Sequence, residues 1–182
     1  DKEKQQAELK KARLSKLASI FARTNSVLTG KRISVNVTDN QSMSAPAWSS
    51  THEVWFNSAH IKDDFSARSL ISLNGLDFHE LSHLKFTPRS AHALPTWVKE
   101  NNYWQAFNAL EDSRIETLFT TRYPSTIDWF TATIMIHFVE NQEAFNRSYP
   151  LLCGRKYLPV EIRAKSRAEY IEPHNLDEIA SI

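Results

Sequence analysis

Apolar residues recur at helical spacing along the first thirty residues of the chain: Leu9, Leu14, Leu17, Ile20, Phe21 and Leu28. This pattern predicts a basic amphipathic helix over 1–30 that ends near Gly30. One stripe of this helix is expected to dock on the body of the protein.

Residues 33–38 alternate between apolar and polar side chains, and two further short runs, at 47–50 and 53–57, also look like strands. Alternation predicts a half-buried strand at 33–38, and we expect the three strands to form a meander. From Phe65 onward the period changes, and it predicts helices over 65–84, 97–121, 127–145 and 162–171. Strands followed by helices are typical of an α+β fold. We therefore expect a leading helix, 1–30, and one α+β domain over 31–182.

The charge of the chain is unevenly distributed. Residues 1–32 carry nine Lys or Arg against three acidic residues, a balance of +6, whereas the remainder has a balance of −5 and the whole chain +1. The basic segment is interpreted either as a solvated helix face or as a surface for nucleic acid or an acidic partner. Because the basic residues are not interleaved with a series of aromatic residues for base stacking, the docked helix is favoured and nucleic-acid binding through 1–32 is the alternative.

The composition argues against several classes of protein. No run of about 18 apolar residues is present, which argues against a membrane span. The single cysteine, Cys153, excludes a disulfide framework and a cysteine-based zinc site, and we expect a reducing, cytoplasmic compartment. The last residues show no stop signal, so we expect the chain to be part of a longer protein.

The residues that carry chemistry lie in the predicted helix over 65–84, where 79–83 read His-Glu-Leu-Ser-His. Residues four apart on a helix stand over one another, about 5–6 Å apart at Cβ. His79 and His83 can therefore both bind one Zn²⁺ ion. Glu80 lies about 100° around the helix from His79, where it can take a proton from a zinc-bound water. The pattern predicts a zinc site with Glu80 as the general base.

A catalytic zinc site needs a third protein ligand. The metzincin spacing would place glycine at 86 and histidine at 89, but Phe86 and Arg89 stand there. The acidic cluster at 107–116 is the better source, and it offers Asp112 or Glu111. We prefer Asp112, because Glu111 shares its helical stripe with apolar residues; His92 is a further alternative.

Other polar residues are candidates for supporting roles. Glu116 and Asn108 share the Asp112 stripe, and a carboxylate there can orient an imidazole ligand. Peptide hydrolysis also needs a donor to the developing oxyanion. The available side chains are Tyr103, Tyr123, His92 and Arg114, and the sequence does not choose between them.

The HELSH motif with the downstream NALEDSRIE segment resembles gluzincin-type zinc metallopeptidases. It is most similar to metallopeptidase domains of bacterial and phage proteins that often precede a von Willebrand A-type domain, including relatives of cobaltochelatase subunits. The likeness covers residues 33–123, with Asn108 and Asp112 at the family's Asn and acidic positions. It implies a zincin-like fold, in which the strand 53–57 corresponds to the edge strand that holds extended substrate.

Three functions follow as hypotheses. The first is a zinc-dependent metallopeptidase that acts on a protein or peptide substrate, with a von Willebrand A-type domain as a downstream partner. The second is a non-catalytic zinc module that recruits partners. The third is a nucleic-acid-binding domain that uses residues 1–32. Retention of Glu80 favours the first, since a purely structural site does not need it.

Overall fold

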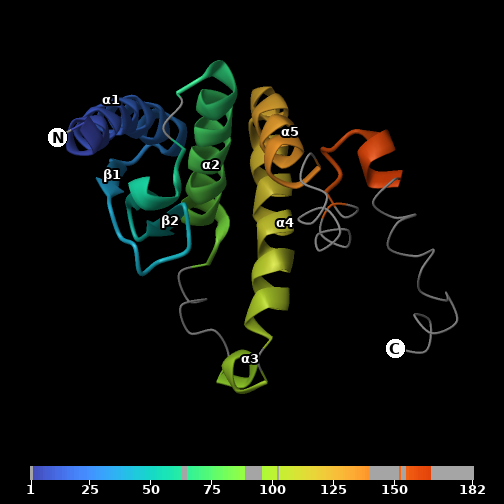
Figure 1. The fold of residues 1–182 in the computed structure, drawn as a ribbon. Coiled ribbons are helices and arrows are strands. Elements are labelled where there is room, and N and C mark those ends of the chain that lie inside the picture. Colours follow the sequence, from blue (N-terminus) through green and yellow to red (C-terminus); the bar gives the residue numbers. More distant parts are fainter. Residues whose placement is uncertain are drawn as a thin grey trace, which may run out of the picture. The chain divides into compact units, whose positions relative to one another are not determined.

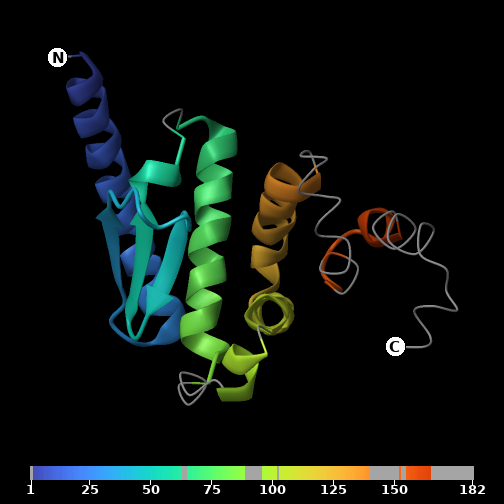
Figure 2. The ribbon, with the colours of Figure 1, turned by 60° about the horizontal axis from the view of Figure 1, so that its bottom comes forward.

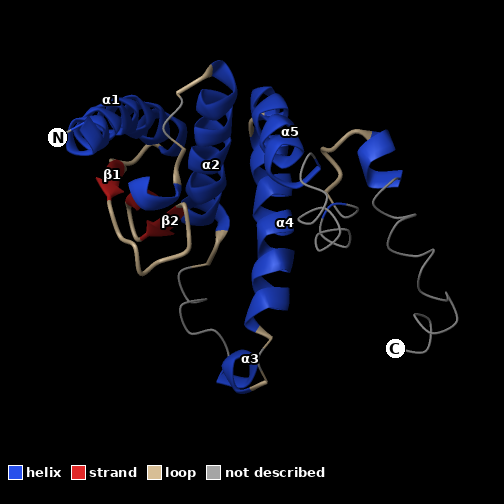
Figure 3. Cartoon of the chain, in the orientation of Figure 1, coloured by secondary structure: helices blue, strands red, loops and turns tan. Residues whose placement is uncertain are grey.

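The computed structural model describes residues 2–62, 65–88, 96–101, 103–139, 152 and 155–164. The chain forms two compact units, Asp1–Lys85 and Phe86–Ile182. Among the described residues, all strands belong to the first unit (Figure 3). The predicted α+β class is confirmed. None of the helices in the described ranges is both long and apolar enough to cross a membrane.

The first unit consists of a long helix, a small sheet and the helix that carries the histidine motif (Figure 1). Its elements in chain order are α1 (Lys2–Thr29), β1 (Ser34–Thr38), β2 (Ala47–Ser50), β3 (Glu53–Asn57), the short 3-10 helix η1 (Ser58–His60) and α2 (Ala67–Phe86). Helix α1 ends where Gly30 adopts a positive φ of 67°, a backbone conformation that glycine adopts without steric penalty. The predicted end of this helix is therefore confirmed.

Helix α1 packs against the sheet through one stripe. Leu14, Ala18 and Phe21 are buried, and the Phe21 ring lies 5.8 Å from that of Phe56 on β3. Two residues of the predicted stripe are instead exposed, Leu9 by 54% and Ile20 by 43%. At about 100° per residue these two lie roughly 120–140° around the helix from Leu14, so the six apolar positions cannot share one face.

The strands do not form the predicted meander. The order is β1-β3-β2, in which β1 pairs with β3 in parallel and β2 pairs with β3 antiparallel (Figure 2). The buried amide of Asn57 helps to hold the connection after β1: its Nδ2 donates to the carbonyls of Asn40 at 2.9 Å and Met43 at 3.2 Å. The chain can therefore pass to the far side of β3 before β2 begins.

This order also corrects the expected role of the strand at 53–57. As β3 it is the central strand, paired on both sides, so it is not the edge strand that the resemblance implied. Both described edges belong to β1 and β2. Trp48 on β2 and Trp55 on β3 stack with ring centroids 6.0 Å apart.

The second unit is helical wherever it has regular structure in the described ranges. Its elements are α3 (Thr96–Glu100), α4 (Trp104–Arg122), the 3-10 helix η3 (Pro124–Thr126), α5 (Ile127–Ile134) and the π-helix η4 (Met135–Val139), and residues 160–164 are also helical. The core centres on Phe119, whose ring lies 6.3 Å from Phe86 and 5.9 Å from Phe130.

Two predicted helices of this unit differ from the structure in the described ranges. The helix expected over 97–121 is divided into α3 and α4, and the backbone N–H of Tyr103 turns back to the carbonyl of Val98 at 2.9 Å. The helix expected over 127–145 leaves α-helical geometry after Ile134 and continues as the π-helix to Val139; residues 140–145 lie outside the described ranges. Of the helix expected over 162–171, the described part is helical.

Candidate metal centre

The two histidines of the motif lie in the C-terminal half of α2. The helix begins after Ser66, whose hydroxyl accepts a hydrogen bond from the backbone N–H of Ser69 at 3.2 Å, as a helix N-cap does. His79 and His83 are half-buried, with ring centroids 5.0 Å apart and ring planes at 87°. One helix face thus presents two neighbouring imidazoles, the donor pair that zinc accepts.

Glu80 follows the first imidazole directly and is only 8% exposed. Leu81, which comes next, is fully buried and anchors this turn of α2 in the core. A carboxylate held in a mostly dry position on a rigid helix can act as a proton acceptor without first being ordered.

A second acidic residue on this helix, Asp77, is fully buried, and the sequence analysis missed it. The side-chain amide of Asn25 on α1 donates to its Oδ1 at 2.9 Å. Its other oxygen, Oδ2, and the amide oxygen of Asn25 are both buried without a hydrogen-bond partner. Burial raises the pKa of Asp77 to about 7; the bond from Asn25 lowers it and the charge of Glu80 raises it. Aspartate is usually an exposed residue, so residue type alone gave no signal.

This raised pKa makes the stability of the first unit depend on pH. Between about pH 4 and pH 7 the carboxyl of Asp77 is ionised in the unfolded chain but protonated in the folded one, so the free energy of unfolding falls as pH rises through this window. The shift from 3.8 to about 7 corresponds to a loss on the order of 4 kcal/mol. We expect Asp77→Asn to be more stable than the wild type above pH 7, because an amide there is neutral and can donate to Asn25.

Urea unfolding between pH 5 and pH 8, with a chelator present throughout, measures this effect. The difference between the Asp77→Asn and wild-type free energies should grow with pH and level off near pH 7. Glu8→Gln, which neutralises an exposed carboxylate on α1, is the matched control and should follow the wild type at every pH. Parallel curves for Asp77→Asn and the wild type would contradict the expectation.

In the second unit, the carboxylate of Glu111 on α4 is engaged by its neighbours. Its Oε1 accepts from the Thr87 hydroxyl at 2.6 Å and from Arg114 Nη2 at 2.7 Å, and its Oε2 accepts from Arg114 Nε at 2.7 Å. The bonds to Glu111 raise the pKa of Arg114, although its burial lowers it. Both oxygens of Glu111 are therefore committed to a bidentate ion pair.

Asp112, the next residue, is half-buried on another stripe of α4. Asn108, one turn before it, is exposed. Glu116, one turn after it, is buried and accepts from Arg155 Nε and from the Tyr157 hydroxyl, each at 2.6 Å. Arg155 and Tyr157 were not singled out from the sequence, since they lie in a stretch without helical or strand periodicity.

The four residues considered as oxyanion donors have different surroundings. Tyr103 is exposed at the start of α4, and the Tyr123 ring lies 4.9 Å from that of Phe119. Arg114 donates to Glu111 and to the carbonyl of Phe86 at 2.9 Å, which gives it a structural role beside α4. His92 lies outside the described residues.

Comparison with known proteins finds no match. No family model, no curated protein and no solved structure matches this chain.

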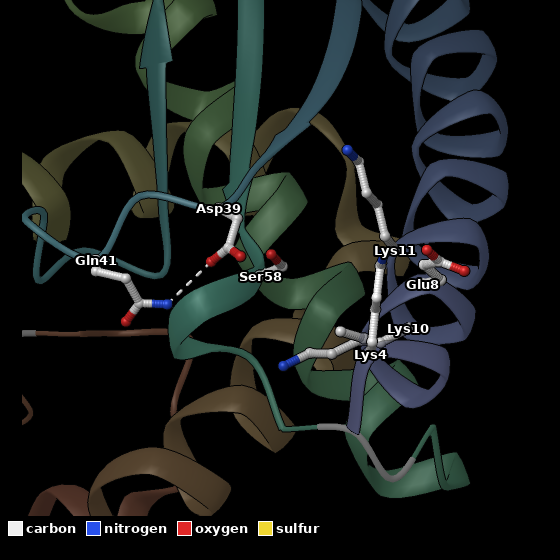
Figure 4. Close-up of a pocket in the computed structure, with 8 residues that line it drawn as sticks. Lys4, Glu8, Lys10, Lys11, Asp39, Gln41 and Ser58 are labelled. Carbon is white, nitrogen blue, oxygen red and sulfur yellow. Dashed lines mark hydrogen bonds between the residues drawn. The ribbon is translucent and has the colours of Figure 1, made fainter. Parts of the chain in front are cut away.

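A hollow of about 400 Å³ lies in the first unit, away from the histidine pair (Figure 4). It is bordered by α1, by the loop after β1 and by η1. Its charged lining residues are of both signs: Lys4, Lys10, Lys11, Glu8 and Asp39. Asp39 accepts a hydrogen bond from Gln41 at 3.1 Å in its wall. The hollow contains neither motif histidine nor Glu80. Its mixed charges give it no clear preference for anions.

Proposed function

We propose that the protein is a zinc-dependent metallopeptidase in which His79, His83 and Asp112 hold the metal ion. The observation that carries the proposal is the pair of neighbouring imidazoles on α2, with the buried carboxylate of Glu80 beside them. Two neutral ligands and one carboxylate are a ligand set found in catalytic zinc sites, where one coordination position stays open.

The hydrogen bonds of Glu111, within the second unit, favour Asp112 as the third ligand. Glu111 already gives both oxygens to Arg114 and Thr87, so binding a metal would require that ion pair to break. Asp112 lies on a different stripe of α4 from Glu111. This supports the preference for Asp112 that the helical stripes indicated.

When bound, the zinc ion supplies Lewis acidity that polarises a carbonyl oxygen and makes a water molecule more acidic. Glu80 accepts a proton from the attacking water at a carboxylate oxygen while the water oxygen forms a bond to the peptide carbonyl carbon. Glu80 then returns this proton to the leaving amine nitrogen as the C–N bond breaks. The burial of Glu80 limits the water that could compete for the same proton.

Metal analysis of the purified protein tests the proposal. We expect one zinc ion per chain in the wild type, and loss of stoichiometric zinc in His79→Ala and in His83→Ala, because each removes one imidazole of the pair. His60→Ala removes an exposed histidine at the end of η1 and should keep the zinc. Full occupancy in either motif variant, or no zinc in the wild type, would overturn the proposed site.

A further inference from the structure

Three side chains of the second unit form a buried ionic cluster, which we call the Glu116 cluster: Glu116, Arg155 and Tyr157. Glu116 is 3% exposed and Arg155 is 5% exposed. Arg155 Nε and the Tyr157 hydroxyl both donate to Oε2 of Glu116 at 2.6 Å. Removing one partner of a buried ion pair leaves an uncompensated charge, so the cluster fixes its members firmly in place.

The cluster lies one helical turn from Asp112. Residues 112 and 116 are four apart on α4, which puts their Cβ atoms about 5–6 Å apart on one stripe. A guanidinium carries five N–H donors in one plane, and that of Arg155 donates to Glu116 through Nε. Because Glu116 lies one turn from Asp112, this bond holds the guanidinium beside the stripe of α4 that carries both carboxylates.

The electrostatics of Arg155 agree with this placement. Burial alone would lower the pKa of Arg155, but the carboxylate of Glu116 raises it, and Tyr157 and the charge of Asp112 raise it further. Burial and the nearby Glu116 carboxylate also raise the pKa of Tyr157, so it stays a neutral donor. The guanidinium is therefore a permanent buried cation that attracts two carboxylates of α4.

We infer that Arg155 is a positioning residue for Asp112, held in place by Glu116 and Tyr157 so that the Asp112 carboxylate is oriented as a metal ligand. The inference rests on the proposed zinc site. Partners that orient a ligand from outside the coordination shell commonly contribute 10–100-fold to metal affinity. Arg155 does this across 43 positions of sequence, from a segment that follows the helical core of the unit.

A double-mutant cycle on zinc affinity, measured by competition with a chelator, tests this role. Arg155→Met should weaken zinc binding about 10–100-fold in the wild-type background. In an Asp112→Ala background, where the two imidazoles remain, the same change should have less than about a twofold effect, because Arg155 acts only through Asp112. An Arg155 effect of equal size in both backgrounds would overturn the inference in favour of a general structural role.

Further variants keep the test decisive if Arg155→Met folds poorly. The double variant Glu116→Gln/Arg155→Met removes both charges, so no buried ion is left unpaired, and it should show the same loss of affinity. Arg122→Met removes an exposed arginine from the end of α4 and should bind zinc like the wild type. If the wild type binds zinc and the double variant binds it with the same affinity, this inference is overturned but the proposed function is not. A wild type that binds no zinc overturns the proposed function and the inference with it.

Discussion

Glu80→Gln should abolish peptide hydrolysis while the protein keeps its zinc and its fold. The amide has nearly the shape of the carboxylate but cannot accept a proton from water, so the step that generates the nucleophile is lost. General-base contributions are about 10²–10⁴-fold, and the rate should fall by at least this range. Cleavage of a mixture of internally quenched peptides by the zinc-loaded protein measures the loss.

The matched control for this experiment is Glu100→Gln, an exposed glutamate at the end of α3, which should cleave like the wild type. Zinc content and thermal unfolding should agree between Glu80→Gln and the wild type. Equal rates in Glu80→Gln and the wild type would show that the mechanism is wrong. Stoichiometric zinc without cleavage by the wild type would instead favour a non-catalytic zinc module.

The sequence predicted the parts of the candidate site that depend on a single helix. Five consecutive residues place His79, Glu80 and His83 in relation to one another, because the geometry of an α-helix is local and regular. The structure contains that helix, as α2, with boundaries within two residues of those predicted. The preference for Asp112 over Glu111 also rests on the stripes of one helix, and it stays a prediction.

Strand partners could not be predicted in the same way. Alternation of apolar and polar residues in β1 tells which of its side chains share a face, but such a pattern is the same whichever strand lies in the middle. Hydrogen bonds from Asn57 to the loop after β1 help to hold the observed order, and they join residues up to 17 positions apart. A polar residue at the end of a strand gives no local sign of such bonds.

The sequence also did not predict which polar side chains are buried. Asn25 and Asp77 are 52 positions apart, and Glu116 and Arg155 are 39 apart. Each of these residue types is normally exposed, so one sequence without its fold predicts a solvated side chain. In both pairs, burial becomes tolerable only through a partner from a distant segment.

Asp112→Ala should weaken zinc binding by more than about 100-fold, and Glu111→Ala should weaken it far less. The first change removes the charged ligand that we propose, and its loss should exceed the 10–100-fold typical of supporting groups. The second removes a carboxylate that is engaged by Thr87 and Arg114. Its effect should appear mainly in the free energy of unfolding, where hydrogen bonds to charged groups contribute about 1.5–3 kcal/mol each.

Chelator competition on both variants at one pH, paired with urea unfolding in the presence of chelator, separates the two residues. The expected result is crossed: Asp112→Ala is the weaker zinc binder, and Glu111→Ala loses more stability through its broken ion pair. The reverse order of zinc affinities would transfer the ligand role to Glu111, which would then have to release Arg114. Small and equal effects on affinity would point to His92 as the third ligand. Only this result fits a site in which Asp112 binds the metal while Glu111 stabilises the fold through its bonds to Arg114 and Thr87.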